Sequence, residues 1–166
     1  SAVTLRNRSI GYGETDNGQY DKTEVTAFAH GAAMMIKRSV IQKAGLMPEL
    51  YFLYYEEYDW SAAVQRAGYK ILYSPTLTIL HKESQSTGKN SPLKTFYLTR
   101  NRLLYSYRNL NLNEFLLSFV YQIVIAGTCK SMLMALRGNR ANAKAIIHGI
   151  IAFFKIKNKK QDKATI

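Results

Sequence analysis

The pattern of hydrophobic and polar positions divides the first part of the chain into short elements. Residues 6–23 are rich in Gly, Asn, Asp and Arg without an apolar period, which predicts a loop. Residues 24–37, EVTAFAHGAAMMIK, carry β-branched, aromatic and Met side chains and predict one strand or two short ones. Gly31, in the middle of this segment, indicates a bend or a place where a ligand meets bare backbone. Residues 38–44 predict a short helix that Gly45 caps at its end.

A second helix is predicted where apolar residues recur on one helical face. The spacing i, i+3, i+4, i+7 starts at Trp60, and Gly68 ends the pattern. Three acidic residues, Glu56, Glu57 and Asp59, therefore occupy the first turn of this helix. The positive end of the helix dipole lowers the free-energy cost of gathering negative charge there, by about 0.3–1 kcal/mol per group.

Short strands are predicted after this helix, at residues 69–73 and 77–81, on either side of Pro75. A strand, a helix and a strand in this order, with acids where the helix begins, form an α/β pattern. Ligand sites are common at the mouth of such a unit, so by analogy the acids become candidates for function.

Three helices are predicted in the second part of the chain. Residues 93–110 mix apolar side chains with Lys and Arg. Residues 115–129, FLLSFVYQIVIAGTC, carry no charge, but a spanning helix needs about twenty residues, so this run predicts an amphipathic helix with a wide apolar face. A third helix, at about residues 141–157, precedes the basic tail. Wide apolar faces with Lys and Arg at their margins fit a membrane interface. The alternative is that these helices pack on a domain core with a basic exterior.

The positive charge is concentrated in this second part. The net charge is +12, yet residues 1–88 hold nine Lys/Arg and nine Asp/Glu, whereas residues 89–166 hold fourteen and two. This asymmetry indicates a basic surface that faces an anionic partner, either nucleic acid or membrane head groups. The single cysteine, Cys129, excludes an internal disulfide and fits a reducing compartment.

The acid cluster has three possible explanations. Carboxylates bind hard cations, they act as general acids or bases when neighbours tune their pKa, or they form a solvated helix start without a further role. The apolar residues Phe52, Leu53 and Tyr54 lead directly into the cluster and favour partly desolvated carboxylates, which is where pKa tuning occurs. His81, at the end of the segment LTIL, is the second candidate, either as a structural residue or as a ligand.

Residues 31–87 resemble the C-terminal half of the catalytic domain of family 2 glycosyltransferases, in particular the bacterial rhamnosyltransferase-like members that build surface polysaccharides. The likeness extends over about residues 8–110. It is specific as an ordered set of motifs, which in this chain are Gly31-Ala32, Lys37-Arg38, Gly45, Glu49, Phe52, Tyr55-Glu56-Glu57-Tyr58-Asp59, Arg66-Ala67-Gly68-Tyr69, Pro75 and His81.

The resemblance implies an α/β fold of the GT-A type and a role for Glu57. Residues 1–88 would form the acceptor-side part of the catalytic domain, and residues 89–166 a basic amphipathic helical region at the membrane interface. Glu57 would remove the proton from the acceptor sugar hydroxyl as this oxygen attacks the anomeric carbon of a nucleotide sugar. The family more often has Asp at this position, and the longer side chain of Glu changes the reach of the base.

The resemblance also implies roles for the neighbouring residues. His81 would help to hold a divalent metal, Mn²⁺ or Mg²⁺, on the donor diphosphate, and imidazole suits Mn²⁺ better. Trp60 would stack on a sugar face, with core packing as the alternative. Together with Trp60, the residues that would line the acceptor side are Gly31, Ala32, Glu56 and Asp59.

The Asp-x-Asp motif that holds the metal in the nucleotide-binding half of such enzymes does not occur in the sequence. We therefore expect a fragment with little transferase activity by itself, from an enzyme that adds a sugar, such as rhamnose, to a lipid-linked cell-surface polysaccharide. The expected location is the cytoplasmic side of the cell membrane, peripherally bound to an anionic surface. The alternative function is a non-catalytic basic module that binds membrane or nucleic acid; Arg residues beside wide apolar faces argue against nucleic acid.

Overall fold

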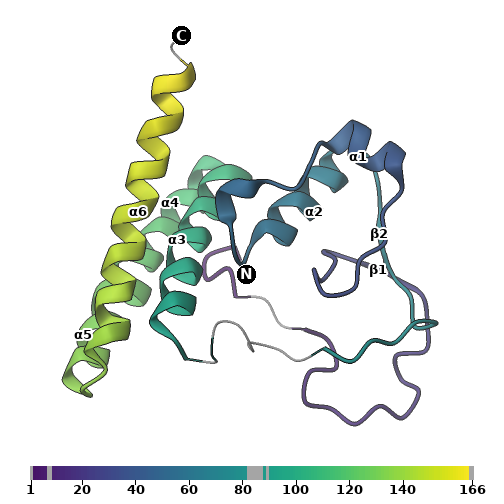
Figure 1. Cartoon of the computed structure of the whole chain (residues 1–166), viewed down its shortest axis with the longest axis horizontal. Coiled ribbons are helices and arrows are strands. Elements are labelled where there is room, and N and C mark those ends of the chain that lie inside the picture. The colour runs from purple at the N-terminus through teal and green to yellow at the C-terminus, as the bar shows by residue number, and fades with distance from the viewer. Residues whose placement is uncertain (1, 7–8, 82–87, 89, 165–166) are drawn as a thin grey trace. The chain divides into compact units, whose positions relative to one another are not determined.

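A computed structural model describes residues 2–6, 9–81, 88 and 90–164 (Figure 1). The chain forms two compact units. The first, called the sheet unit below, comprises Arg6–Phe52 and Glu56–Glu83. The second, called the helical unit, comprises Ser1–Leu5, Leu53–Tyr55 and Ser84–Ile166.

The sheet unit contains a small antiparallel sheet and two α-helices. The strands pair in the register that places Val25 opposite Leu72. Its elements are β1 (Glu24–Thr26), α1 (Arg38–Ala44), the 3₁₀ turn η1 (Glu49–Tyr51), α2 (Glu56–Arg66) and β2 (Ile71–Tyr73).

Both helices of the sheet unit confirm the sequence predictions. Helix α1 ends at Gly45, which has the left-handed φ of 83° and donates its N–H to Ile41 O at 2.9 Å. Helix α2 begins with the three acids in its first turn, and Gly68 follows it with a φ of 89°.

The predicted strands are shorter than expected. Of residues 24–37, only β1 is a strand, and residues 77–81 form no strand in the described structure. The reason lies in residues 27–29, which leave the sheet and pack along α2. Ala27 O accepts a hydrogen bond from Gln65 Nε2 at 2.8 Å, and Ala29 N donates one to Ser61 Oγ at 3.3 Å. Hydrogen bonds to helix side chains thus replace those of a strand ladder.

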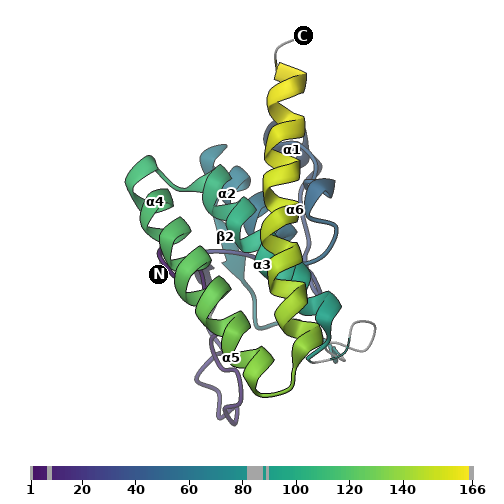
Figure 2. The same ribbon diagram turned by 90° about the vertical axis from the view of Figure 1, so that its left-hand side faces the viewer.

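The helical unit is a bundle in which α6 runs beside α3 and beside the long helix built from α4, η2 and α5 (Figure 2). Gly149 allows α6 to approach α3 closely, since a Cβ at this position would lie 2.8 Å from Phe96 O. The elements are α3 (Pro92–Asn109), α4 (Leu112–Val120), the π-helical segment η2 (Tyr121–Cys129), α5 (Lys130–Leu136) and α6 (Arg140–Ala164).

The core of the helical unit combines apolar packing with buried polar contacts. Leu103, Ile146 and Phe153 are almost fully buried. Ser118 Oγ donates a hydrogen bond to Val3 O at 3.0 Å, and Gln122 Nε2 donates one to Thr4 O at 3.3 Å. These two side chains, one helical turn apart, attach the N-terminal residues to the bundle.

The long helix Leu112–Leu136 is longer than the sequence analysis predicted. It starts earlier because the side chain of Asn111 caps it by accepting the N–H of Glu114 at 3.0 Å. It continues past Cys129 because one exposed lysine, Lys130, does not interrupt a helix. Among the described residues it is the one helix long and apolar enough to cross a membrane, judged by length and composition, and little of it is buried.

Candidate active site at the start of helix α2

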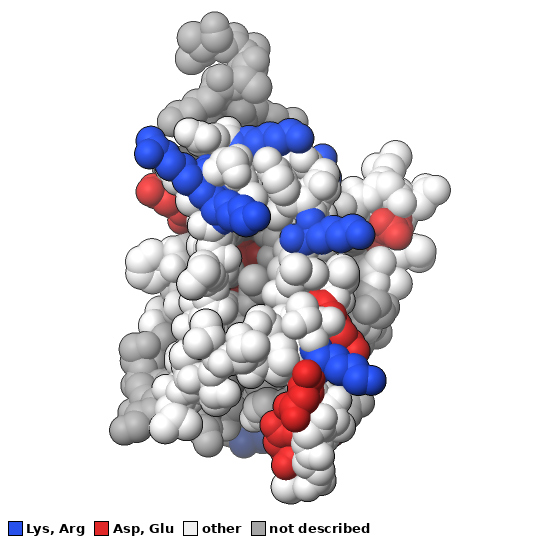
Figure 3. Space-filling model, turned by 90° about the vertical axis from the view of Figure 1, so that its right-hand side faces the viewer, with Lys and Arg blue, Asp and Glu red and all other residues white. Residues whose placement is uncertain are grey.

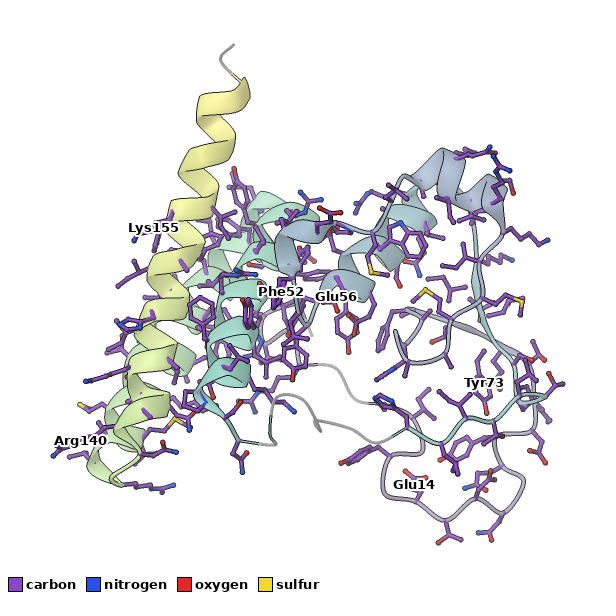
Figure 4. The ribbon with its side chains drawn as sticks, in the orientation of Figure 1. Glu14, Phe52, Glu56, Tyr73, Arg140 and Lys155 are labelled. Carbon is purple, nitrogen blue, oxygen red and sulfur yellow. The ribbon has the colours of Figure 1, made fainter. Side chains whose placement is uncertain are left out.

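The acid cluster occupies the first turn of α2, as predicted. The helix begins at Glu56, which is labelled in Figure 4, and continues with Glu57 and Asp59. The free N–H groups and the dipole of this turn offset part of the repulsion between the carboxylates. The three carboxylates differ in their surroundings, and these differences decide what each can do.

Glu57 is half-buried, and its pKa is raised. Burial is the main cause, because it disfavours the charged form of the carboxyl. A hydrogen bond with the backbone of Glu57 lowers the pKa, and the neighbouring charge of Glu56 raises it further. A carboxylate with a raised pKa is a stronger base than an exposed one, so Glu57 has the property that a general base requires.

Glu56 and Asp59 have surroundings that differ from those of Glu57. Glu56 Oε2 is buried and accepts no hydrogen bond from the described part of the chain. A buried carboxylate oxygen without a donor is costly unless a ligand supplies one. Asp59 is 2% exposed, so little of it is available to a ligand in this structure.

One side of α2 carries the segment that follows β1. Tyr58, Ser61 and Gln65 lie at the helical spacing i, i+3, i+7 and therefore share this side. The ring of Phe28 packs edge-on against Tyr58 with centroids 4.4 Å apart, and Ser61 and Gln65 make the hydrogen bonds described above. Glu57 precedes Ser61 by one helical turn and so begins the same side of the helix.

His81 lies beside His30, which the sequence analysis did not select. The two imidazole rings have centroids 6.1 Å apart and meet edge to face. His30 directly precedes Gly31 and Ala32, and its Nδ1 accepts the N–H of Ala32 at 3.2 Å. The structure thus brings three of the predicted site residues, Gly31, Ala32 and His81, to one place through His30. In the described part of the chain no hydrogen bond or ion pair joins His81 to Glu57.

The residues around His81 do not form a metal centre by themselves. No group of three His, Cys, Asp or Glu side chains that could hold a metal ion occurs among the described residues. Nδ1 of His30 already accepts the N–H of Ala32, so this ring nitrogen is occupied within the protein. The role of His81 as a metal ligand stays a prediction from the resemblance.

Trp60 and Gly31 differ in their burial and in what the fold requires at each position. Trp60 is buried, which favours the core-packing alternative, and its assignment to the acceptor side stays a prediction. Gly31 is exposed, its φ lies outside the left-handed region, and a Cβ there would meet no atom within 4 Å. The fold therefore does not require glycine at position 31.

The hydrophobic pattern pointed to Trp60 and Val64 and passed over the polar side of the same helix. Ser61 and Gln65 could have been noticed, because with Tyr58 they form a polar stripe at helical spacing. Figure 3 shows one face of the molecule, on which acidic and basic side chains lie among uncharged ones.

The chain is similar to part of several glycosyltransferases. It is 32% identical over 60 residues to N-acetylglucosaminyl-diphospho-decaprenol L-rhamnosyltransferase from two strains of Mycobacterium tuberculosis. This alignment covers 36% of the present chain and 20% of the rhamnosyltransferase. It is 30% identical over 100 residues to the low-salt glycan biosynthesis hexosyltransferase Agl10 of Haloferax volcanii, which covers 60% of this chain and 33% of that protein.

These similarities support a relationship to glycosyltransferases at this general level. The matches span a fifth to a third of the length of the curated relatives. No protein-family model matches the chain. No solved structure matches it significantly.

Proposed function

We propose that the chain is the acceptor-side part of a glycosyltransferase of the GT-A type that acts in the synthesis of a cell-surface polysaccharide. The observation that carries this proposal is the half-buried Glu57 in the first turn of α2, with its pKa raised by burial and by Glu56. The partial similarity to a rhamnosyltransferase and a hexosyltransferase supports the same class of reaction.

In the proposed reaction Glu57 acts as the general base. Its carboxylate takes the proton of an acceptor sugar hydroxyl while the hydroxyl oxygen bonds to the anomeric carbon of the nucleotide sugar. The bond between that carbon and the diphosphate oxygen breaks, and the nucleoside diphosphate leaves with the bonding electron pair. Glu56, whose Oε2 is buried without a donor, would accept a hydrogen bond from a second acceptor hydroxyl.

The test compares two adjacent acids in a complete enzyme that contains this chain. Glu57→Gln removes the base and keeps the shape, so we expect sugar transfer to fall by about 10²–10⁴-fold. Glu56→Gln is the matched control, for which we expect a raised KM for the acceptor and a smaller fall in kcat. An unchanged transfer rate in Glu57→Gln would show that this carboxylate is not the base.

The isolated chain provides a separate test. The chain contains no Asp-x-Asp motif to hold the metal of the donor, so we expect the purified chain to catalyse little or no sugar transfer. Robust turnover without further polypeptide would contradict the assignment to the acceptor side alone. Rhamnose is the first donor sugar to try, because one set of relatives carries a rhamnosyltransferase name.

We also propose that the helical unit attaches the enzyme to the cytoplasmic face of a membrane. The long helix Leu112–Leu136 exposes many of its apolar side chains, and the second part of the chain has a large excess of Lys and Arg. Anionic head groups attract each such residue near the surface by about 1 kcal/mol. Attachment to a membrane would keep the enzyme on the surface that holds a lipid-linked acceptor.

Flotation with liposomes tests the attachment. We expect the chain to float with vesicles of phosphatidylglycerol and phosphatidylcholine, and the double change Leu117→Asp and Val124→Asp to weaken this binding. Leu46→Asp, at a still more exposed position in the sheet unit, is the control that should still bind. Salt-sensitive binding to RNA without flotation would instead favour a nucleic-acid-binding module.

A further inference from the structure

The residues that lead into α2 have an unusual backbone conformation. Phe52, Tyr54 and Tyr55 have φ angles of 61°, 65° and 75° (Phe52 is labelled in Figure 4). Residues with a side chain rarely adopt positive φ, because Cβ crowds the neighbouring carbonyl oxygen. Glycine or asparagine adopts it more easily, yet the chain has aromatic residues at all three positions. Such conformations persist only where the surroundings hold them.

The side chain of Asn101, in α3, makes hydrogen bonds to the backbone of this segment. Its side chain is 0% exposed, and its Nδ2 donates hydrogen bonds to Leu53 O at 2.6 Å and to Tyr54 O at 2.8 Å. Its Oδ1 accepts a hydrogen bond from Arg100 Nε at 2.7 Å, which fixes the orientation of the amide. Asn101, Leu53 and Tyr54 all belong to the helical unit.

Two further side chains of α3 contact Tyr54 and Tyr55. The hydroxyl of Tyr55 accepts a hydrogen bond from Arg102 Nε at 3.0 Å and donates one to Leu5 O at 2.8 Å. Lys94 Nζ lies over the ring of Tyr54, 5.6 Å from its centroid. The carbonyls of Leu53 and Tyr54 and the side chains of Tyr54 and Tyr55 are therefore all held by α3. A linker that served only to connect η1 with α2 would not need these contacts.

We propose that Asn101 is a positioning residue for Glu57, which acts through the strained segment that precedes α2. By holding the carbonyls of Leu53 and Tyr54, Asn101 fixes the left-handed backbone of Tyr54 and Tyr55, and the chain enters the first turn of α2 directly after them. The carboxyl of Glu57 lies two residues beyond Tyr55, so its surroundings depend on this conformation. This inference rests on the proposed role of Glu57 as the base.

The test uses the chain itself and does not depend on sugar transfer. Asn101→Leu removes both hydrogen-bond donations and keeps the branched shape of the side chain, with two methyl groups in place of the amide. We expect the amide hydrogens of residues 59–62, the first that bond within α2, to exchange at least about tenfold faster. We also expect the pKa of the Glu57 carboxyl, followed by ¹³C NMR, to move toward its ordinary value. Asn109→Leu, at the end of the same helix, is the control that should change neither.

The proposal is overturned if folded Asn101→Leu keeps the exchange of residues 59–62 and the Glu57 titration of the original chain. If Asn101→Leu does not fold, Asn101→Asp offers the same test, because its carboxylate keeps the shape of the amide and cannot donate to the two carbonyls. Unchanged exchange and titration in that variant equally overturn the proposal.

A complete enzyme separates this proposal from the proposed function. With Asn101→Leu we expect kcat to fall by about tenfold to a hundredfold while the KM for the donor stays unchanged, since a misplaced base slows chemistry and leaves donor binding intact. Normal transfer by Glu57→Gln would refute the proposed base, whereas the exchange and titration measurements would still decide whether Asn101 controls the start of α2.

Discussion

The indole Nε1 of Trp60 donates a hydrogen bond to the carbonyl oxygen of Gly45 at 2.8 Å, which connects α2 to the end of α1. Trp60 is 6% exposed. The residue that ends α1 is thus also the acceptor that orients the indole. A tryptophan held in this way stabilises the sheet unit and offers little ring surface to a sugar.

Trp60→Phe should therefore destabilise the protein. The phenyl ring keeps most of the apolar contact but cannot donate to Gly45 O, so we expect the free energy of unfolding to fall by about 1–3 kcal/mol. Urea denaturation measures this difference. If stability is unchanged while the KM for the acceptor rises in a complete enzyme, then Trp60 binds the sugar instead of the core.

The raised pKa of Glu57 predicts how stability depends on pH. The folded protein binds the proton of this carboxyl more tightly than the unfolded chain does, so the group contributes stability below the ordinary pKa of 4.5. This contribution is lost as the pH rises through the raised pKa. Relative to Glu57→Gln, the original chain should therefore become progressively less stable above pH 4.5 and then level off.

Urea denaturation of both proteins at a series of pH values tests this dependence. Glu24→Gln, which changes an exposed acid of β1, is the control and should alter stability by no more than about 0.5 kcal/mol. A constant difference between the original chain and Glu57→Gln at all pH values would show that burial does not perturb the carboxyl.

Gly31→Ala separates a structural role from a ligand-binding role at position 31. A Cβ there meets nothing in the structure, so we expect stability to stay the same or to rise by about 0.4–1 kcal/mol, because the unfolded chain loses freedom. Thermal denaturation checks this. If sugar transfer by a complete enzyme also falls, a ligand approaches the bare backbone; a clear loss of stability would contradict the observed geometry.

Gly149→Ala should weaken the helical unit. The added Cβ would lie 2.8 Å from Phe96 O and 3.1 Å from Thr99 Cβ, so α6 would have to move away from α3. We expect a loss of about 1–3 kcal/mol in the free energy of unfolding, as for other overpacked sites. His148→Ala, at the exposed neighbouring position, should change stability by less than about 0.5 kcal/mol. Equal stability of both variants would contradict the close contact.

The sequence by itself determined the local features of the chain. The position of α1 and its cap at Gly45, the acids in the first turn of α2, and the extent of α3 all follow from apolar spacing, helix capping and turn residues. These signals depend on residues within one or two helical turns of each other, so a single sequence contains them.

The tertiary structure decided everything that depends on contacts between distant residues. Residues 27–29 pack on α2 instead of extending β1 because Ser61 and Gln65, more than thirty positions away, supply their hydrogen bonds. Asn101 is also distant in sequence from Leu53 and Tyr54, and its side-chain amide donates to the carbonyl of each. Hydrophobic periodicity does not indicate which distant polar groups form hydrogen bonds, because those partners depend on how the whole chain packs.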